Sequence, residues 1–351
     1  MSYHYLLDLA LILLSTKLLG LAAQKFQMPQ VVGALLAGLI LSPAGLGLLS
    51  ETEFTAQLSE LGVIVLMFSA GMGTDIKELK NSGKAGFMVA LLGVAVPFVM
   101  GAGLAWGAAE AGLIESSGMI ENIFIGTVLT ATSVSITVET LKEMKKLETK
   151  VGNTILAAAL IDDVLGLIAL TLVCSLAGGD ESIGMVLVKI VGFFIFAFAV
   201  GFAANRVFCW MLKRQHGWAS HRNSVFAFVL CLVMAYCAEE FFGVADITGA
   251  YAAGLAVACT PKGTYIQTKY NPLGYLLLTP VFFASIGINV QISGLTGGMV
   301  VFAILLLLVS IVSKLLGCGL GAKACRFSTR ESIQVGAGMA CRGEVALIVA
   351  N

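Results

Sequence analysis

The feature that most constrains this chain is a succession of apolar stretches, each about 20 residues long, the length that a helix needs to cross the hydrocarbon layer of a bilayer. They follow one another along all 351 residues, and we expect twelve of them. With 58% hydrophobic and 12% charged residues, the composition excludes a soluble protein. The stretches begin near Tyr5, Val31, Thr55, Ala85, Asn122, Val151, Ile183, Asn223, Asp246, Pro272, Gly297 and Ser332.

Basic residues are confined almost entirely to every second loop. All but four of the 21 Lys and Arg residues lie in the loops after the odd-numbered stretches, with four of them between Lys142 and Lys150, and the loops after the even-numbered stretches carry acidic residues instead. The positive-inside rule then predicts a multi-pass protein of the cell inner membrane with its N-terminus outside. The formal net charge of zero gives no reason to expect a nucleic-acid partner.

Two adjacent carboxylates, Asp162 and Asp163, lie near the middle of the sixth apolar stretch. Each costs about 2.5 to 3.5 kcal/mol to insert at mid-span, so a cation, water or a basic partner must compensate. Neighbouring positions on a helix point about 100° apart, so one carboxylate can face water while the other faces a partner. We interpret this pair as the site that binds a transported cation or a proton.

Lys314, in the eleventh stretch, is the first candidate partner for one of the two carboxylates. At 4 Å and an effective dielectric constant near 20, an ion pair gains about 4 kcal/mol, which offsets much of the insertion cost of one Asp. The alternative is that the lysine extends its ammonium to the membrane surface. The sequence leaves both interpretations open.

Two stretches contain residues that favour interrupted helices. The fifth has a hydroxyl-rich centre with Thr130, Thr132 and Ser133, and the twelfth combines glycines with Arg342 and Glu344. Interrupted helices in corresponding positions are typical of transporters that are built from repeats. Since the two stretches lie seven apart, we expect inverted six-helix repeats at about 5–178 and 223–351, joined by a linker helix at about 183–210. A thirteenth helix is then expected beyond Asn351.

On these residues the chain resembles the monovalent cation:proton antiporter-2 family, the group of Kef-type and bacterial Na⁺/H⁺ antiporters. The resemblance implies an all-α membrane protein of the sodium/proton antiporter fold, with 12 visible transmembrane helices of an expected 13 and broken crossover helices. It also implies a single transporter domain that works as a homodimer in the lipid bilayer. No cofactor is implied, and the eight cysteines show no metal-binding spacing.

The same resemblance implies roles for the residues quoted. Asp163 would bind the cation and the proton, Asp162 with Lys314 would form a switchable ion pair, and Arg342 with Glu344 a structural or gating pair. Thr130, Thr132 and Ser133 would line a crossover helix. The expected activity is exchange of a monovalent cation for protons by an elevator-like movement. The Asp-Asp pair, in place of Gln-Asp, favours Na⁺ over K⁺.

Other functions stay open at this level. An electroneutral K⁺/H⁺ exchanger, a channel-like Kef-type efflux protein and a sodium-coupled organic-anion symporter would all use a similar architecture. An intramembrane aspartyl hydrolase needs carboxylates that converge on one water from two helices. Here the two carboxylates are adjacent on one helix, so we do not expect an enzyme.

Overall fold

The computed structural model describes residues 3–74, 76–114, 118–176, 183–213, 220–260, 263–290 and 297–342, and these residues form helices and no strands. The chain divides into two compact units. Unit 1 comprises 1–75, 142–144 and 191–293, and unit 2 comprises 76–141, 145–190 and 294–351. Each unit therefore combines segments from the two halves of the sequence.

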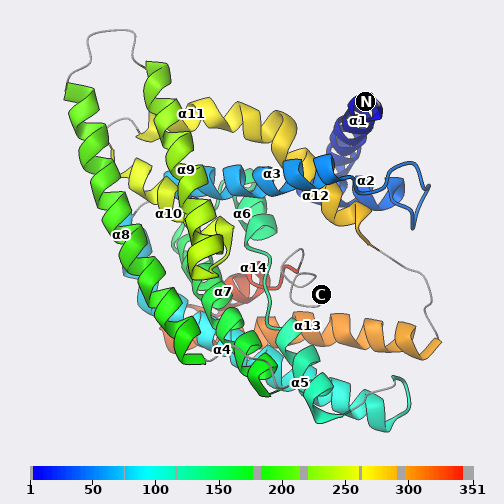
Figure 1. Cartoon of the computed structure of the whole chain (residues 1–351). Coiled ribbons are helices and arrows are strands. Elements are labelled where there is room, and N and C mark those ends of the chain that lie inside the picture. Colours follow the sequence, from blue (N-terminus) through cyan, green and yellow to red (C-terminus); the bar gives the residue numbers. More distant parts are fainter. Residues whose placement is uncertain are drawn as a thin grey trace. The chain divides into compact units, whose positions relative to one another are not determined.

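Unit 1 is built around short and long helices that are labelled in Figure 1. Helix α8 (Ile183–Lys213) begins in unit 2 and continues in unit 1 from Val191. The others are α1 (His4–Lys25), α2 (Gln30–Leu41), α3 (Glu53–Met72), α9 (Ser220–Phe242), α10 (Asp246–Ala258), α11 (Gly263–Leu273), the π-helical turn η1 (Gly274–Leu278) and α12 (Thr279–Ile288).

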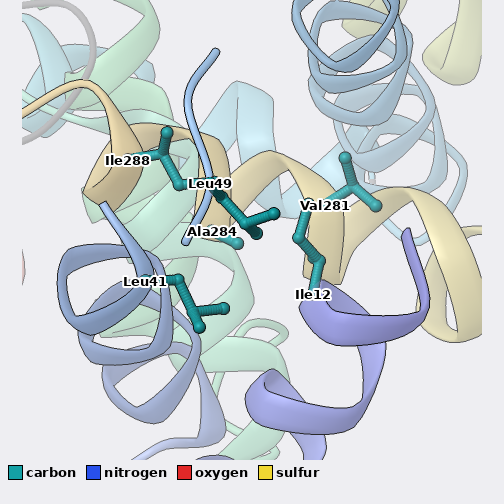
Figure 2. Close-up of a cluster of buried hydrophobic side chains, with 6 residues drawn as sticks. All are labelled: Ile12, Leu41, Leu49, Val281, Ala284 and Ile288. Atoms are coloured by element: carbon teal, nitrogen blue, oxygen red, sulfur yellow. The ribbon is translucent and has the colours of Figure 1, made fainter. Parts of the chain in front are cut away.

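A buried apolar cluster holds α1, α2 and α12 together, as Figure 2 shows. Small residues allow other pairs of helices in this unit to approach closely: a Cβ atom on Gly254 of α10 would lie 2.9 Å from the Cα atom of Gly71 on α3. Such contacts are typical of membrane helices, which gain from close packing because lipid tails are as apolar as their side chains. The cluster consists of Ile12, Leu41, Leu49, Val281, Ala284 and Ile288.

The segment from α11 to α12 changes its helical pitch at η1. Pro280 follows this turn and has no N–H to donate to the carbonyl of Leu276, four residues earlier. A π-helical turn accommodates such a loss because its hydrogen bonds follow a different spacing.

Unit 2 contains the residues singled out in the sequence. Helix α4 packs against α5, α7 and α13, and α13 also packs against α14 (Figure 1). The last turn of α6, from Lys142, belongs to unit 1. The helices are α4 (Ile76–Glu110), α5 (Met119–Val128), α6 (Val134–Glu143), α7 (Lys150–Leu176), α13 (Gly297–Ala324) and α14 (Thr329–Gly338).

The fifth apolar stretch is interrupted, as its hydroxyl-rich centre predicts. Helix α5 ends at Val128 and α6 begins at Val134, and residues 129–133 between them leave the helical path (Figure 1). In the twelfth stretch α14 ends at Gly338, and residues 339–342 continue without regular helix. The predicted interruption is thus seen in the fifth stretch, and in the twelfth the described helix ends at Gly338; that both are crossover helices stays a prediction.

Eight helical segments of the described chain are long and apolar enough to cross a membrane. An all-helical membrane protein is therefore the class that the structure supports. The crossing of the shorter apolar helices, the count of twelve or thirteen spans and the boundaries of the repeats stay predictions.

A capping box starts α14 and yields a first testable prediction. The hydroxyl of Ser328 accepts from the N–H of Glu331 at 3.2 Å, and the N–H of Ser328 donates to Glu331 Oε2 at 2.8 Å. Ser328→Ala should lower the free energy of unfolding by about 1 kcal/mol, because one N–H of the first turn loses its acceptor. A lower melting temperature in detergent at neutral pH is the expected result, and an unchanged one would contradict it.

The pH dependence of this cap follows from Glu331. The N–H and hydroxyl of Ser328 hold the pKa of the Glu331 carboxyl below its ordinary value of 4.5. A lowered pKa in the folded state means that the cap contributes fully above pH 4.5 and that its contribution is lost as the pH falls through the lowered value. The difference in melting temperature between Ser328→Ala and the unmodified protein should therefore shrink in acid.

Candidate functional site

Helix α7 positions both intramembrane carboxylates of unit 2. Asp162 is almost completely buried, with 2% of its surface exposed, and Asp163 is half-buried. The two side chains leave the helix about 100° apart, so they have different surroundings although they are neighbours in the chain. Asp162 is thus the more deeply buried of the two, and that Asp163 faces water stays a prediction.

Lys314 lies opposite Asp162, from the middle of α13. Its Nζ atom donates to Asp162 Oδ1 at 2.9 Å and to Oδ2 at 3.0 Å, and its side chain is fully buried. The structure therefore supports the pairing interpretation and not the extension of the ammonium to the membrane surface. A buried ammonium and carboxylate compensate for each other only when the geometry is this close, because both lose their hydration.

The two irregular segments, 129–133 and 339–342, meet through their backbones. The N–H of Ser133 donates to the carbonyl of Cys341 at 3.0 Å, and the hydroxyl of Thr137 donates to the carbonyl of Gly338 at 3.0 Å. Arg342 donates from Nη1 to the carbonyl of Ala131. Backbone groups that left the helical pattern thus find partners in the other segment, which a membrane interior requires.

Local side-chain hydrogen bonds explain where α5 ends and where α6 begins. The hydroxyl of Thr130 donates to the carbonyl of Thr127 at 2.7 Å, in the last turn of α5. The hydroxyl of Ser133 accepts from the N–H of Ile136 at 3.3 Å, which makes Ser133 the residue that caps α6. Short hydroxyl side chains compete with the backbone pattern of a helix, so this composition favours the interruption.

Thr132, at the centre of the same segment, is fully buried, and its hydroxyl oxygen has no hydrogen-bond partner among the described residues. A buried hydroxyl without a partner costs about 1 to 3 kcal/mol, so such a group is suited to binding water or a cation. Thr130 brings the segment close to α7, because a Cβ atom on Gly166 would lie 3.9 Å from its Oγ1 atom. Gly166 is one helical turn from Asp162 and Asp163.

The guanidinium of Arg342 lies just beyond the C-terminus of α5. Carbonyl groups at the end of a helix carry a partial negative charge, so a cation is stabilised there. Two further donors of Arg342, Nε and Nη2, meet no acceptor within the described part of the chain. Glu344, which the sequence pairs with Arg342, lies outside the described residues.

Unit 2 thus brings together Asp162 with Lys314, and the segment of Thr130, Thr132 and Ser133 with Arg342. The sequence did not indicate the carbonyls of Ala131 and Cys341, because a backbone acceptor leaves no signal in a side-chain pattern.

Glu139, which is buried in α6 with 6% of its surface exposed, was also not singled out from the sequence. A carboxylate in a hydroxyl-rich apolar stretch could have indicated it. No cluster of three or more His, Cys, Asp or Glu residues suited to a resident metal occurs in the described ranges.

Two stretches that leave the helical pattern and meet through hydrogen bonds, in a membrane protein with a buried ion pair, are typical of secondary transporters. The chain belongs to the sodium/hydrogen exchanger family, whose transmembrane model matches residues 10–351. It is 40% identical to a probable Na⁺/H⁺ antiporter, GerT, of Bacillus cereus, over 98% of this chain and 89% of that protein. It is 37% identical to a Na⁺/H⁺ antiporter of Enterococcus hirae, over 97% of this chain and 87% of that protein.

A second protein of Bacillus cereus, the Na⁺/H⁺-K⁺ antiporter GerN, is 38% identical over 100% of this chain and 88% of its own length. Among solved structures, the sodium proton antiporter MjNhaP1 of Methanocaldococcus jannaschii is similar with a TM-score of 0.76. The likeness covers 100% of this chain and 85% of that one at 19% identity, so it shows the fold alone.

Proposed function

We propose that this protein exchanges a monovalent cation, with Na⁺ favoured over K⁺, for protons across the inner membrane. The observation that carries the proposal is the buried pair of Lys314 with Asp162 at 2.9 Å, directly beside a second carboxylate, Asp163. One ammonium engages both oxygens of Asp162, so it is already committed to that residue. The names of the relatives as Na⁺/H⁺ antiporters support the same reading.

In this proposal Asp163 binds the cation and the proton in turn. Asp163 is half-buried in a membrane helix, where a proton or a cation can supply the stabilisation that a carboxylate gains from water outside the membrane. Competition between the two for one carboxylate is what couples their movements. Asp162 and Lys314 form the switchable pair, which parts or protonates during the cycle.

The crossover segments supply the rest of the proposed site. Thr132 offers its buried hydroxyl to the cation or its water, and Thr130 and Ser133 shape the segment around it. Arg342 stabilises the end of α5, and its remaining donors suit Glu344 as the structural or gating partner. The alternatives are an electroneutral K⁺/H⁺ exchanger, a channel-like efflux protein and a sodium-coupled organic-anion symporter.

A fluorescence assay on proteoliposomes tests the function. Vesicles with an imposed pH gradient and a pH-sensitive dye are given NaCl, KCl or an osmotically matched neutral solute. Cation-triggered proton movement is the expected result, larger for NaCl than for KCl. KCl must be included because the relative GerN is named for K⁺ as well as Na⁺. Proton movement that does not depend on either cation would refute antiport.

For the architecture we propose two inverted repeats and a homodimer. Both units draw on the two predicted repeats, which supports an internal symmetry. Unit 2 carries the described site residues, so we assign to it the cation-carrying part of an elevator-like movement.

The proposed orientation places the N-terminus outside and gives a topology prediction. Helix α4 has Lys77, Lys80 and Lys84 near its start and the exposed Glu110 at its end, so its start should face the cytoplasm. In a background without native cysteines, Glu110→Cys should react with a membrane-impermeant maleimide in intact cells. Lys146→Cys, in a loop with four basic residues, should react only after the membrane is opened. Labelling of position 146 from outside would overturn this topology.

A further inference from the structure

Helix α4 passes the buried ion pair at Gly93 with no side chain in between. A Cβ atom on Gly93 would lie 3.7 Å from Lys314 Nζ and 3.8 Å from Asp162 Oδ1. The same atom would lie 2.5 Å from the Sγ atom of Cys318, a separation that real Cβ atoms essentially never show. Any side chain at this position would therefore displace the thiol and touch both members of the pair.

Cys318 is one helical turn after Lys314 on α13, so the two side chains share one face of that helix. Its side chain is fully buried. The approach of α13 to α4 is close along this face, because a Cβ atom on Gly317 would lie 2.4 Å from the carbonyl oxygen of Leu92. The thiol has little freedom to yield, since the backbones on either side of it are already in contact.

We propose that Gly93 and Cys318 are positioning residues that hold the Lys314 ammonium on Asp162. The absence of a side chain at Gly93 leaves one space that the thiol and the ammonium share. Pressure on the thiol is passed along one turn of α13 to Lys314, because packed interiors transmit strain. The inference rests on the proposed function only in that the ion pair takes part in transport.

The first test is Gly93→Ala, assayed in proteoliposomes. Forcing a methyl group into a filled space should lower the exchange rate roughly tenfold, and should shift the pH at which exchange is half-maximal. Cys318→Ala removes the atom that the new methyl group would strike, and the remaining contacts at 3.7 and 3.8 Å are ordinary. The double variant should therefore exchange within about twofold of Cys318→Ala alone.

Gly86→Ala is the matched control on the same helix. A Cβ atom there would lie 2.8 Å from the Cβ atom of Ala157 on α7, so it tests crowding at a site without the ion pair. Its cost should not be relieved by Cys318→Ala, and it should leave the pH profile in place. Gly103→Ala, where a Cβ atom meets nothing within 4 Å, should behave as the unmodified protein.

A second measurement does not depend on transport. The effect of Gly93→Ala on the melting temperature should differ between the unmodified protein and the variant that lacks the pair, Asp162→Asn with Lys314→Met. The inference would be overturned if the melting-temperature effects of Gly93→Ala and of removing the pair were additive. It would also be overturned if Gly93→Ala matched Gly86→Ala both in its pH profile and in its response to Cys318→Ala. If the unmodified protein failed to exchange cations for protons, the proposed function would be refuted. The melting-temperature comparison would still test whether Gly93 acts on the ion pair.

Discussion

Asp163→Asn is expected to reduce cation/proton exchange to the level of empty vesicles. An amide can neither release a proton nor offer the negative charge that replaces the lost hydration of a cation. Asparagine has nearly the size and shape of aspartate, and Asp163 is only half-buried on α7, so the fold should stay intact. Proteoliposomes with the pH-sensitive dye and a NaCl pulse measure the loss.

Asp162→Asn is the matched comparison, on the neighbouring residue of the same helix. The amide can still accept a hydrogen bond from Lys314, and Asp163 keeps its charge, so transport should survive with an altered pH dependence. The proposed role of Asp163 would be refuted if Asp163→Asn protein, shown to be folded by size-exclusion chromatography, exchanged Na⁺ at the unmodified rate. Equal losses in the two variants would mean that the carboxylates act as one site.

Lys314→Met is the second change with a large expected effect, this time on stability. It leaves the carboxylate of Asp162, which is 2% exposed, without its ammonium. Breaking a buried ion pair by removing one partner costs about 3 to 5 kcal/mol. A clear drop in melting temperature in detergent at neutral pH is expected.

The double variant Asp162→Asn with Lys314→Met serves as the control. It removes both charges, so it should recover most of the stability that Lys314→Met loses, even though it carries two substitutions and not one. A double variant no more stable than the single one would show that the charges do not compensate for each other.

The voltage dependence of transport tests Lys314 separately. If exchange is electrogenic, Lys314→Gln should weaken the dependence of the exchange rate on an imposed membrane potential, since one charge gains about 2.3 kcal/mol per 100 mV.

Some features of the fold and site were predictable because they depend on short-range properties of the chain. The length of an apolar stretch predicts a membrane helix, and the hydroxyl groups of Thr130 and Ser133 predict where the fifth stretch leaves the helix. Asp162 and Asp163 stood out because the insertion cost of a carboxylate is counted residue by residue. Each of these inferences needs only a window of a few turns.

The partners across the site could not be predicted in the same way. From the sequence, Lys314 could pair with either carboxylate or extend to the membrane surface. That it pairs with Asp162, 152 residues away in the chain, depends on how α13 is placed relative to α4 and α7. The repeats and the orientation in the membrane are likewise relations between distant segments, and they stay predictions.

The sequence by itself determined that this is a helical membrane protein with a costly pair of carboxylates and a fifth stretch that leaves the helical pattern, because these follow from local transfer energies and local backbone preferences. Only the tertiary structure decided that Asp162 takes the lysine, that Arg342 reaches the carbonyl of Ala131, and that Gly93 leaves room for the thiol of Cys318. These contacts are set by distances of a few ångströms between separate helices. The pattern of residues along one helix does not specify distances between helices, because these distances arise from how several helices pack together.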